Sequence, residues 1–292
     1  MDRVFGHRGG ADRGVTVSRI GDLRRITRPL HPGLRRYLRG RTGYSHHAPP
    51  YRVRMVPTGR VTVSVNLAEP FSQVRRLGAP DPGTGRIGSM VVGMEDRPAC
   101  CAHAGGLQEV IRLEFTPLGA YRLLALPMRE LTNLAVELVD VLGPAAGLLV
   151  ERLAATPGWA ARFDLLDAVL LPRLEHGPEP AAEVAHAWHL LARSAGTLPV
   201  ARLAEEVGWS RGHLVRRFTE QVGLTPKTSA RVLRFRRAAD LLAHGPVDLA
   251  ALATDCGYYD QAHLTREFRA LAGLTPGRMA TAARPVDEAL DL

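Results

Sequence analysis

Two kinds of hydrophobic periodicity divide the chain. Apolar and polar residues alternate over 61–67 and again over 107–115. The apolar positions are Val61, Val63, Val65 and Leu67 in the first segment and Ile111, Leu113 and Phe115 in the second. A period of two is typical of half-buried strands, so a small β-rich region is predicted to begin near Tyr51. Residues 78–88, which are rich in Gly and Pro, predict a loop between the two segments.

Beyond Pro117 the apolar spacing lengthens to three and four residues, as in amphipathic helices. The segments with this spacing are 118–126, 130–142, 145–155, 159–174 and 181–196. Pro-Gly and Gly-Pro pairs at 157–158 and 177–178 separate some of them. Strands followed by helices predict the α+β fold class for the chain as a whole.

The same patterns predict the domain boundaries. Residues 1–20 are rich in Gly and Arg without periodicity and are expected to be disordered. Residues 21–180 are expected to form a β-rich and then helical sensing or dimerisation domain. An all-α domain follows over residues 181–285, and residues 286–292 form an acidic tail.

One pattern occurs twice near the C-terminal end: "GWSRGHLVRRFTEQVGLTP" from Gly208 and "GYYDQAHLTREFRALAGLTP" from Gly257. A short apolar stripe at i, i+3, i+4 and i+7 precedes each copy, as expected for a short helix. The stripe residues are Val200, Leu203, Ala204 and Val207 before the first copy and Leu249, Leu252, Ala253 and Cys256 before the second. Cys256 is therefore expected to be a buried apolar residue.

Each copy then predicts a turn and a second helix. The glycine favours a C-cap turn, and Ser210 or Asp260 is suited to the N-cap of the helix that follows. The apolar pairs of the second helices are Leu214 with Phe218 and Leu264 with Phe268. Helix, glycine turn, N-cap and helix together form the pattern of a helix-turn-helix.

The opposite face of each second helix carries the candidate DNA-reading residues. They are Gly212, Val215 and Arg216 in the first copy and Ala262, Thr265, Arg266 and Arg269 in the second, where Gln261 lies at the first turn. An Arg in the major groove can bind guanine O6 and N7, and a Gln can pair with adenine. The small residues Gly212 and Ala262 permit close approach or contact with a thymine methyl.

The segment between the copies is predicted to be a helix over 227–243, with Thr225 as N-cap and Pro226 at its start. At 1.5 Å per residue it spans roughly 25 Å, so with its loops it can hold two reading helices about one DNA turn apart. The candidate phosphate contacts are Arg217, Thr225, Lys227 and Arg231.

The charge agrees with a polyanionic partner. The formal net charge is +9, and residues 1–60 and 196–284 are basic around an acidic middle. Arginine carries nearly all of the positive charge, since Lys227 is the only lysine. A positive field attracts nucleic acid, and Arg suits phosphate and guanine, although a GC-rich genome also enriches Arg.

Several function classes lack their sequence signals. The N-terminus has no apolar signal segment, and residues 134–150 contain charges and a Gly-Pro break, so a cytoplasmic protein without a membrane span is expected. The adjacent Cys100 and Cys101, with His103 and His46-His47, could form a metal or thiol sensor, but zinc sites usually use a C-x2-C spacing. No nucleophile elbow, phosphate loop or dinucleotide fingerprint is present, so neither an enzyme nor a cofactor is expected.

The repeat resembles the AraC family of transcriptional regulators over Leu198 to about Arg284, most specifically in "DCGYYDQAHLTREFRALAGLTPGRM". The resemblance implies two helix-turn-helix units joined by a linker helix. It places Arg211, Gly212, Val215 and Arg216 on the first recognition helix and Gln261, Ala262, Thr265 and Arg266 on the second. Gly212 departs from the larger residue that the family often has there. The segment "YRVRMVPTGRVTVSVNL" is similar to the ligand-sensing or dimerising domains that precede this module in part of the family.

The sequence thus predicts a regulator that binds double-stranded DNA at specific sequences. A small-molecule effector, RNA polymerase and a second copy of the chain are candidate partners. Two alternatives stay open at this point. The first is a DNA alkylation-repair regulator with a cysteine methyl acceptor, and the second is an architectural protein that binds DNA without sequence preference.

Overall fold

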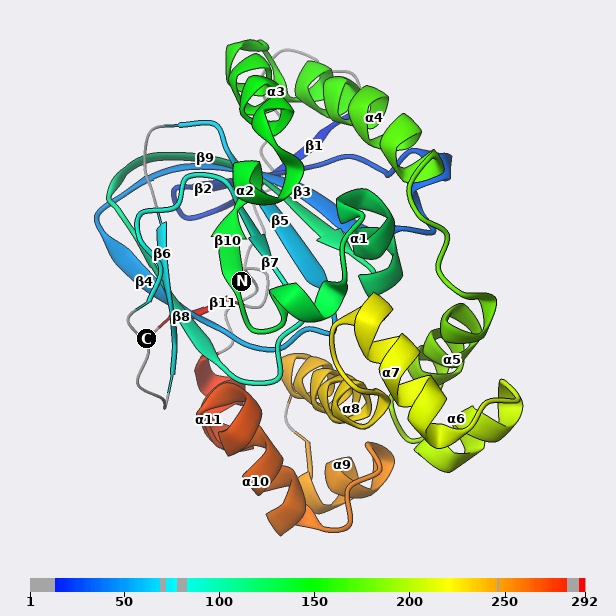
Figure 1. Cartoon of the computed structure of the whole chain (residues 1–292). Coiled ribbons are helices and arrows are strands. Elements are labelled where there is room, and N and C mark those ends of the chain that lie inside the picture. Colours follow the sequence, from blue (N-terminus) through cyan, green and yellow to red (C-terminus); the bar gives the residue numbers. More distant parts are fainter. Residues whose placement is uncertain (1–13, 69–71, 78–82, 246, 283–288, 292) are drawn as a thin grey trace.

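Two antiparallel sheets form most of the N-terminal half in the computed structural model (Figure 1), which describes residues 14–68, 72–77, 83–245, 247–282 and 289–291. The larger sheet has the order β1-β2-β3-β9-β5-β7-β10 and the smaller one β11-β4-β8-β6. The strands of the larger sheet are β1 Thr16–Ile20, β2 Leu23–Thr27, β3 Leu38–Ala48, β5 Val61–Asn66, β7 Met90–Val92, β9 Gly106–Phe115 and β10 Ala135–Glu137. Those of the smaller sheet are β4 Tyr51–Met55, β6 Ser72–Arg76, β8 Ala99–His103 and β11 Ala289–Asp291.

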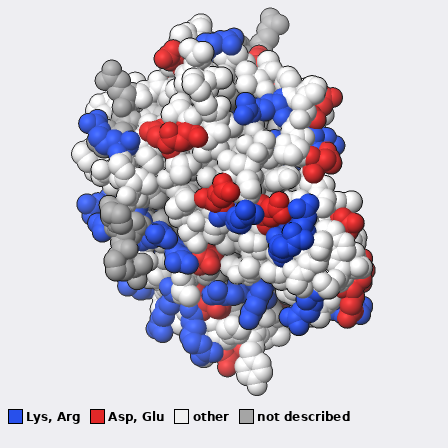
Figure 2. All heavy atoms as spheres, viewed as in Figure 1, with Lys and Arg blue, Asp and Glu red and all other residues white. Residues whose placement is uncertain are grey.

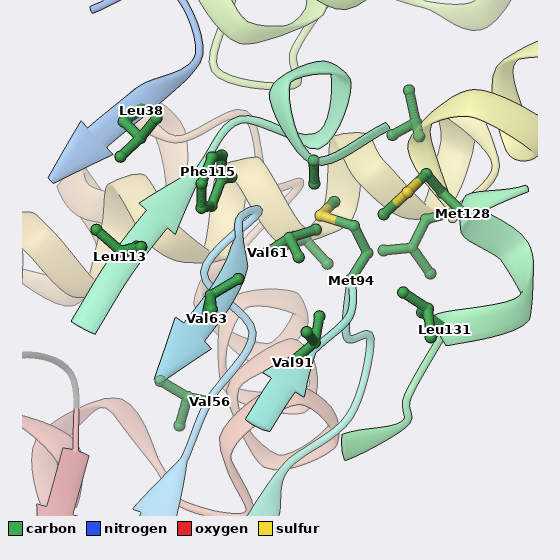
Figure 3. Close-up of a cluster of buried hydrophobic side chains, with 14 of the residues drawn as sticks. Leu38, Val56, Val61, Val63, Val91, Met94, Leu113, Phe115, Met128 and Leu131 are labelled. Atoms are coloured by element: carbon green, nitrogen blue, oxygen red, sulfur yellow. The ribbon is translucent and has the colours of Figure 1, made fainter. Parts of the chain in front are cut away.

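The two alternating segments are adjacent strands, as predicted. β5 pairs with β9 in a register that places Val63 opposite Leu113. The inward residues Val61, Val63, Val65, Ile111, Leu113 and Phe115 are all buried, and Figure 3 shows several of them in one apolar cluster. Because successive side chains alternate between faces, Thr62, Ser64 and Arg112 lie on the other face of this sheet.

The sheet begins earlier than the sequence predicted, because β1, β2 and β3 precede Tyr51. The prediction of disorder over residues 1–20 is wrong for Thr16–Ile20, and residues 1–13 lie outside the described part of the chain. Strand β1 pairs with β2 through a tight hairpin in which Ile20 lies opposite Leu23. Gly21 has a φ of +58° there, which suits a two-residue hairpin turn.

The prediction of one helix over 130–142 is also wrong. The 3-10 helix η2, Met128–Leu131, is followed by Asn133 with a φ of +58°, by edge strand β10 and by the short helix α2, Leu138–Leu142. Val136 lies opposite Val91, and the Glu137 carboxylate accepts a hydrogen bond from the Gly88 N–H at 2.8 Å. Pairing with a strand distant in sequence overrides the local helical pattern.

Three other predicted helices of this half are present as α1, Pro117–Leu124; α3, Pro144–Ala155; and α4, Trp159–Glu175. Helix α4 packs on the larger sheet. A Cβ built on Gly43 would lie 2.4 Å from the Trp159 ring, so only glycine fits there. A buried ion pair joins Arg41 of β3 to Asp167 of α4. Arg28 reaches the same carboxylate at 3.1 Å and Asp164 at 2.6 Å.

The C-terminal part of the described chain is helical. Its helices are α5 Ala182–Arg193, α6 Val200–Glu206, α7 Arg211–Val222, α8 Pro226–Ala243, α9 Leu249–Asp255, α10 Gln261–Ala272 and α11 Pro276–Ala282. Helix α5 packs on α6, α7 and α8, and α7 also packs on α1 and η2 of the N-terminal half. One apolar core therefore runs through both halves, and the boundary near residue 181 stays a prediction. Within the described residues, no helix is long and apolar enough to cross a membrane.

Candidate nucleic-acid interface

The two copies of the repeat fold into equivalent pairs of helices. The first unit consists of α6 and α7 and the second of α9 and α10; we call α7 and α10 the reading helices. Gly208 and Gly257 adopt φ values of +68° and +72° in the two turns, a conformation that favours glycine. The predicted N-caps are confirmed, because Ser210 and Asp260 accept hydrogen bonds from the backbone N–H groups of His213 and His263.

The inner face of each unit is packed as predicted. Leu214 and Phe218 of α7 and their equivalents Leu264 and Phe268 of α10 are fully buried. Cys256 is also fully buried, in agreement with its predicted apolar role, and burial raises the pKa of its thiol. The rotation of each reading helix about its own axis is therefore determined by its inner face, which leaves the opposite face outward.

The outward faces carry the predicted reading residues. Arg211, Gly212, Arg216, Gln261, Ala262, Arg266 and Arg269 are exposed, whereas Val215 and Thr265 are half-buried. The Thr265 hydroxyl donates to the Gln261 carbonyl at 2.9 Å, which leaves the methyl group of Thr265 as its more available contact. Arg216 and Arg266 occupy equivalent places, and no described side chain forms an ion pair with either of them.

The four candidate phosphate contacts differ in their surroundings. Lys227 is exposed near the start of α8, and Thr225 caps that helix by accepting from the Thr228 N–H at 3.2 Å. Arg217 forms an ion pair with Glu220 at 2.8 Å. Arg231 makes hydrogen bonds of 2.9 and 3.1 Å to the carboxylate of Glu267, which raise the pKa of the guanidinium. Lys227 thus remains the most accessible cation of this group.

The linker helix α8 connects the units as predicted and packs directly on the second one. It has 18 residues, so it is about 27 Å long. Val232, Phe235 and Ala238 form its buried face, and the Phe235 ring meets the Phe268 ring edge-on with centroids 4.9 Å apart. Figure 2 shows Lys and Arg side chains gathered over the C-terminal helices in the lower half of the face in view.

Sequence reasoning missed two features of this surface. Trp209 with His213 and Tyr258 with His263 form equivalent edge-on ring pairs, at 4.5 and 5.3 Å, which close the turn of each unit. The shared His three residues after each N-cap was the available signal. Tyr259 is 92% exposed beside the start of α10. It is an extra residue in the turn of the second copy, which has two residues between Gly257 and Asp260 where the first copy has only Trp209.

The cysteine and histidine residues are divided between the two sheets, with Cys100, Cys101 and His103 in β8 of the smaller sheet and His46 and His47 in β3 of the larger one. Burial raises the pKa of Cys101 to about 12 and lowers that of His103 to about 4. The His103 ring bonds to the Ser72 hydroxyl at 2.9 Å and stacks on Tyr51. Among the described residues, no three His, Cys, Asp or Glu side chains are grouped to hold a metal ion.

Comparison with known proteins agrees with the geometry of the C-terminal half. A family model described as a helix-turn-helix domain matches residues 203–282. The uncharacterized HTH-type transcriptional regulator YbfI of Bacillus subtilis (strain 168) is 40% identical over 90 residues. That match covers 30% of this chain and 32% of the relative, so the chain matches about a third of the length of this curated relative.

Solved structures with similar folds include ToxT from Vibrio cholerae O395, with 9% identity, a TM-score of 0.47 and coverage of 86% of this chain and 100% of that one. An AraC-type regulator from Chromobacterium violaceum has 25% identity, a TM-score of 0.33 and coverage of 36% of this chain and 95% of its own. The C-terminal domain of AraT from Geobacillus stearothermophilus has 20% identity and a TM-score of 0.35, and the match covers 38% of this chain and 93% of that one.

Proposed function

We propose that the whole chain is an AraC-type transcription regulator that binds specific DNA sequences. The helix-turn-helix family model that matches residues 203–282 and the similarity to an HTH-type transcriptional regulator support this proposal. The observation that carries this proposal is the equivalence of Arg216 and Arg266. Both project from reading helices whose opposite faces are fully buried. An isolated surface Arg is usually only a solvated charge, but the same Arg at the same point of two units favours a shared role.

In the proposed complex, α7 and α10 enter successive segments of the major groove on one side of the duplex. Arg216 and Arg266 would each take guanine O6 and N7, and Gln261 would pair with adenine. Ala262 and the Thr265 methyl are suited to thymine methyl groups. The first unit has Gly212 where the second has Ala262. Base recognition by the first unit would therefore depend more on Arg211 and Arg216.

Phosphate contacts would set the position of the helices without selecting the sequence. Lys227, beside the capped start of α8, is the first candidate because helix N-termini favour anions. Arg217 and Arg231 would have to exchange a carboxylate for a phosphate. Thr225 is available only if its hydroxyl keeps its N-cap bond, accepts from the Thr228 hydroxyl at 2.9 Å and donates its own proton outward.

The N-terminal half would sense a small molecule, dimerise, or do both. The protein would be cytoplasmic, with RNA polymerase as a candidate partner. Its smaller sheet carries a cluster of polar groups that includes Ser72, Tyr51 and His103, which an apolar core would not require. The high pKa of Cys101 opposes a thiolate, so the structure does not favour an alkyl acceptor at this cysteine. Mass measurement after exposure to alkylated DNA tests that alternative directly.

Selection of bound duplexes from a random pool, with the full chain at near-physiological salt, tests the proposed function. We expect enrichment of a site with two defined patches about ten base pairs apart, one for each reading helix. Binding without enrichment of any sequence would contradict the proposal and leave a general DNA-binding protein. The enriched duplex then supplies the probe for the binding measurements on variants.

A further inference from the structure

We propose that Arg54 and Thr132 of the N-terminal half are positioning residues that determine which spacing between the two DNA patches the protein accepts. The proposal rests on the DNA-binding function above. Its structural basis is a pair of segments, residues 93–98 and 131–134, that we call the bracket. The bracket lies against the C-terminal ends of both reading helices, whereas their DNA-reading residues begin at the opposite, N-terminal ends.

The bracket is one well-connected unit. The Asn133 side chain donates to the Asp96 carboxylate and accepts from the Asp96 backbone N–H, both at 3.0 Å. The Asn133 N–H donates to the Met94 carbonyl, and the Gly93 N–H to that of Leu134. A Cβ on Gly93 would lie 1.9 Å from the Leu131 carbonyl oxygen, so the two backbones are in direct contact. Figure 3 shows Met94 beside Leu131 in the apolar cluster beneath.

The first contact is with the end of α7. The Thr132 hydroxyl donates a 2.6 Å hydrogen bond to the carbonyl of Gly223, the C-cap residue of that helix. Gly223 has a φ of +101°, and a Cβ there would lie 3.2 Å from the Met128 carbonyl oxygen and 3.4 Å from the Met94 side chain. Because terminal helix carbonyls lack partners within the helix, this bond holds a group that the helix itself leaves open.

The second contact is with the end of α10. Arg54 of β4 donates a 3.1 Å hydrogen bond to the Ala272 carbonyl, next to the C-cap Gly273. A Cβ on Gly273 would lie 2.7 Å from the Arg54 guanidinium and 3.9 Å from Pro98 of the bracket. Asp96, Arg97 and Pro98 face Arg231, Arg269 and Gly273 across a groove of about 460 Å³. The bracket and β4 thus reach the C-terminal end of α10, which is equivalent to the end of α7 that the bracket reaches.

The two contact points are equivalent in the repeat. Gly223 and Gly273 occupy the same place in the two copies, and Met94 beside the first and Pro98 beside the second belong to one short segment. A segment of that length spans at most about 18 Å. The N-terminal half therefore relates the two helix ends to each other directly, in addition to the connection through α8.

Small rotations at these ends become large displacements on DNA. Helix α10 has 12 residues and is about 18 Å long. A rotation of about 10° around its held end moves the Gln261 end by about 3 Å, which is close to the 3.4 Å rise of one nucleotide along a strand. Holding both ends should therefore restrict the protein to one spacing between patches.

The test measures binding of the full chain to duplexes whose two patches are separated by the selected spacing or by one base pair more or less. We expect the unmodified protein to lose tenfold or more in affinity at either altered spacing. In the double variant Arg54→Ala, Thr132→Val the loss should shrink to threefold or less. Arg52→Ala, an exposed arginine on the same strand, is the matched control and should keep the full discrimination.

Each outcome has a separate meaning. If the folded double variant keeps the same dependence of affinity on spacing, the positioning role is overturned. If the unmodified protein shows no sequence-specific binding at all, the proposed function is overturned instead. Folding is checked by circular dichroism and the thermal midpoint. If the double variant does not fold, Thr132→Val and Arg54→Gln are measured singly; each should weaken the discrimination, and full discrimination in both would overturn the proposal.

Discussion

The guanidinium of Arg231 on α8 binds the carboxylate of Glu267 on α10 through two hydrogen bonds, of 2.9 and 3.1 Å. The first unit has Arg217 at the place of Glu267, so this contact belongs to the second unit alone. A two-point Arg–carboxylate pair constrains orientation as well as distance. Together with the Phe235–Phe268 ring contact, it sets the orientation of the second reading helix relative to the linker helix.

We expect Arg231→Ala to lower the free energy of unfolding by about 1–2 kcal/mol, because a partly buried carboxylate loses a two-point partner. Urea denaturation measures this difference. The control is Arg237→Ala, which removes an exposed arginine of the same helix and should change stability by less than about 0.5 kcal/mol. Equal effects of the two variants would contradict the structural role of the pair. A smaller salt slope of DNA binding would show instead that Arg231 leaves Glu267 for phosphate.

We expect Arg266→Ala to lose about 1–3 kcal/mol of binding free energy. The protein should also lose its preference at one base pair of the site and keep its preference at the others. Competition with duplexes substituted at each position measures this effect. Arg216→Ala should behave in the same way at a second position about ten base pairs away. Equal weakening on every duplex would mean that these arginines only contact phosphate.

Lys227→Ala should weaken binding by a similar factor on specific and unrelated duplexes, because a phosphate contact carries no sequence information. The slope of log affinity against log salt should fall by about one. Titrations at several salt concentrations give both quantities. A loss restricted to the specific duplex, with the salt slope unchanged, would argue against a phosphate contact.

Glu95 of the bracket predicts a pH dependence of stability. Burial raises its pKa from the ordinary value of 4.5 to about 8, although Arg112 opposes the rise. The folded protein therefore holds this proton more tightly than the unfolded chain does. Its stability should fall as pH rises from about 4.5 to 8, because the unfolded chain releases this proton at a lower pH than the folded protein does. Denaturation midpoints measured across this range give the dependence.

Glu95→Gln should remove that part of the pH dependence and stabilise the protein above pH 7, because a neutral amide replaces a carboxyl that would otherwise ionise. Glu130→Gln, which changes an exposed carboxyl of η2, should leave the pH profile unchanged. A Glu95→Gln profile parallel to that of the unmodified protein would show that the Glu95 carboxyl is already ionised at neutral pH in the folded state.

The repeated units were predictable because their signals are local. Apolar spacing, the glycine turns and the Ser210 and Asp260 caps lie within a few residues of the structures that they specify. Burial of Phe218 and Phe268 follows from the same period. The outward set of candidate reading residues then follows by exclusion, which is why sequence and structure place these residues on the same faces.

Contacts between distant segments were not predictable in this way. Nothing near Asn133 in the sequence indicates Asp96 as its partner, and nothing near Thr132 indicates Gly223. The same limit explains the incorrect helix over 130–142, where pairing of Val136 with Val91 decided the conformation. Arg231 was a candidate phosphate contact, and no local signal indicates its partner Glu267, which lies 36 positions away.

The ratio of dissociation constants for the selected duplex and a scrambled duplex of equal composition, at near-physiological salt, tests the central claim most directly. The account predicts that the full chain prefers the selected duplex by about a thousandfold or more, as specific regulators do. It also predicts that Arg216→Ala, Arg266→Ala together remove most of this preference. A ratio near one, with affinity that falls steeply as salt rises, would contradict sequence-specific recognition by the two reading helices.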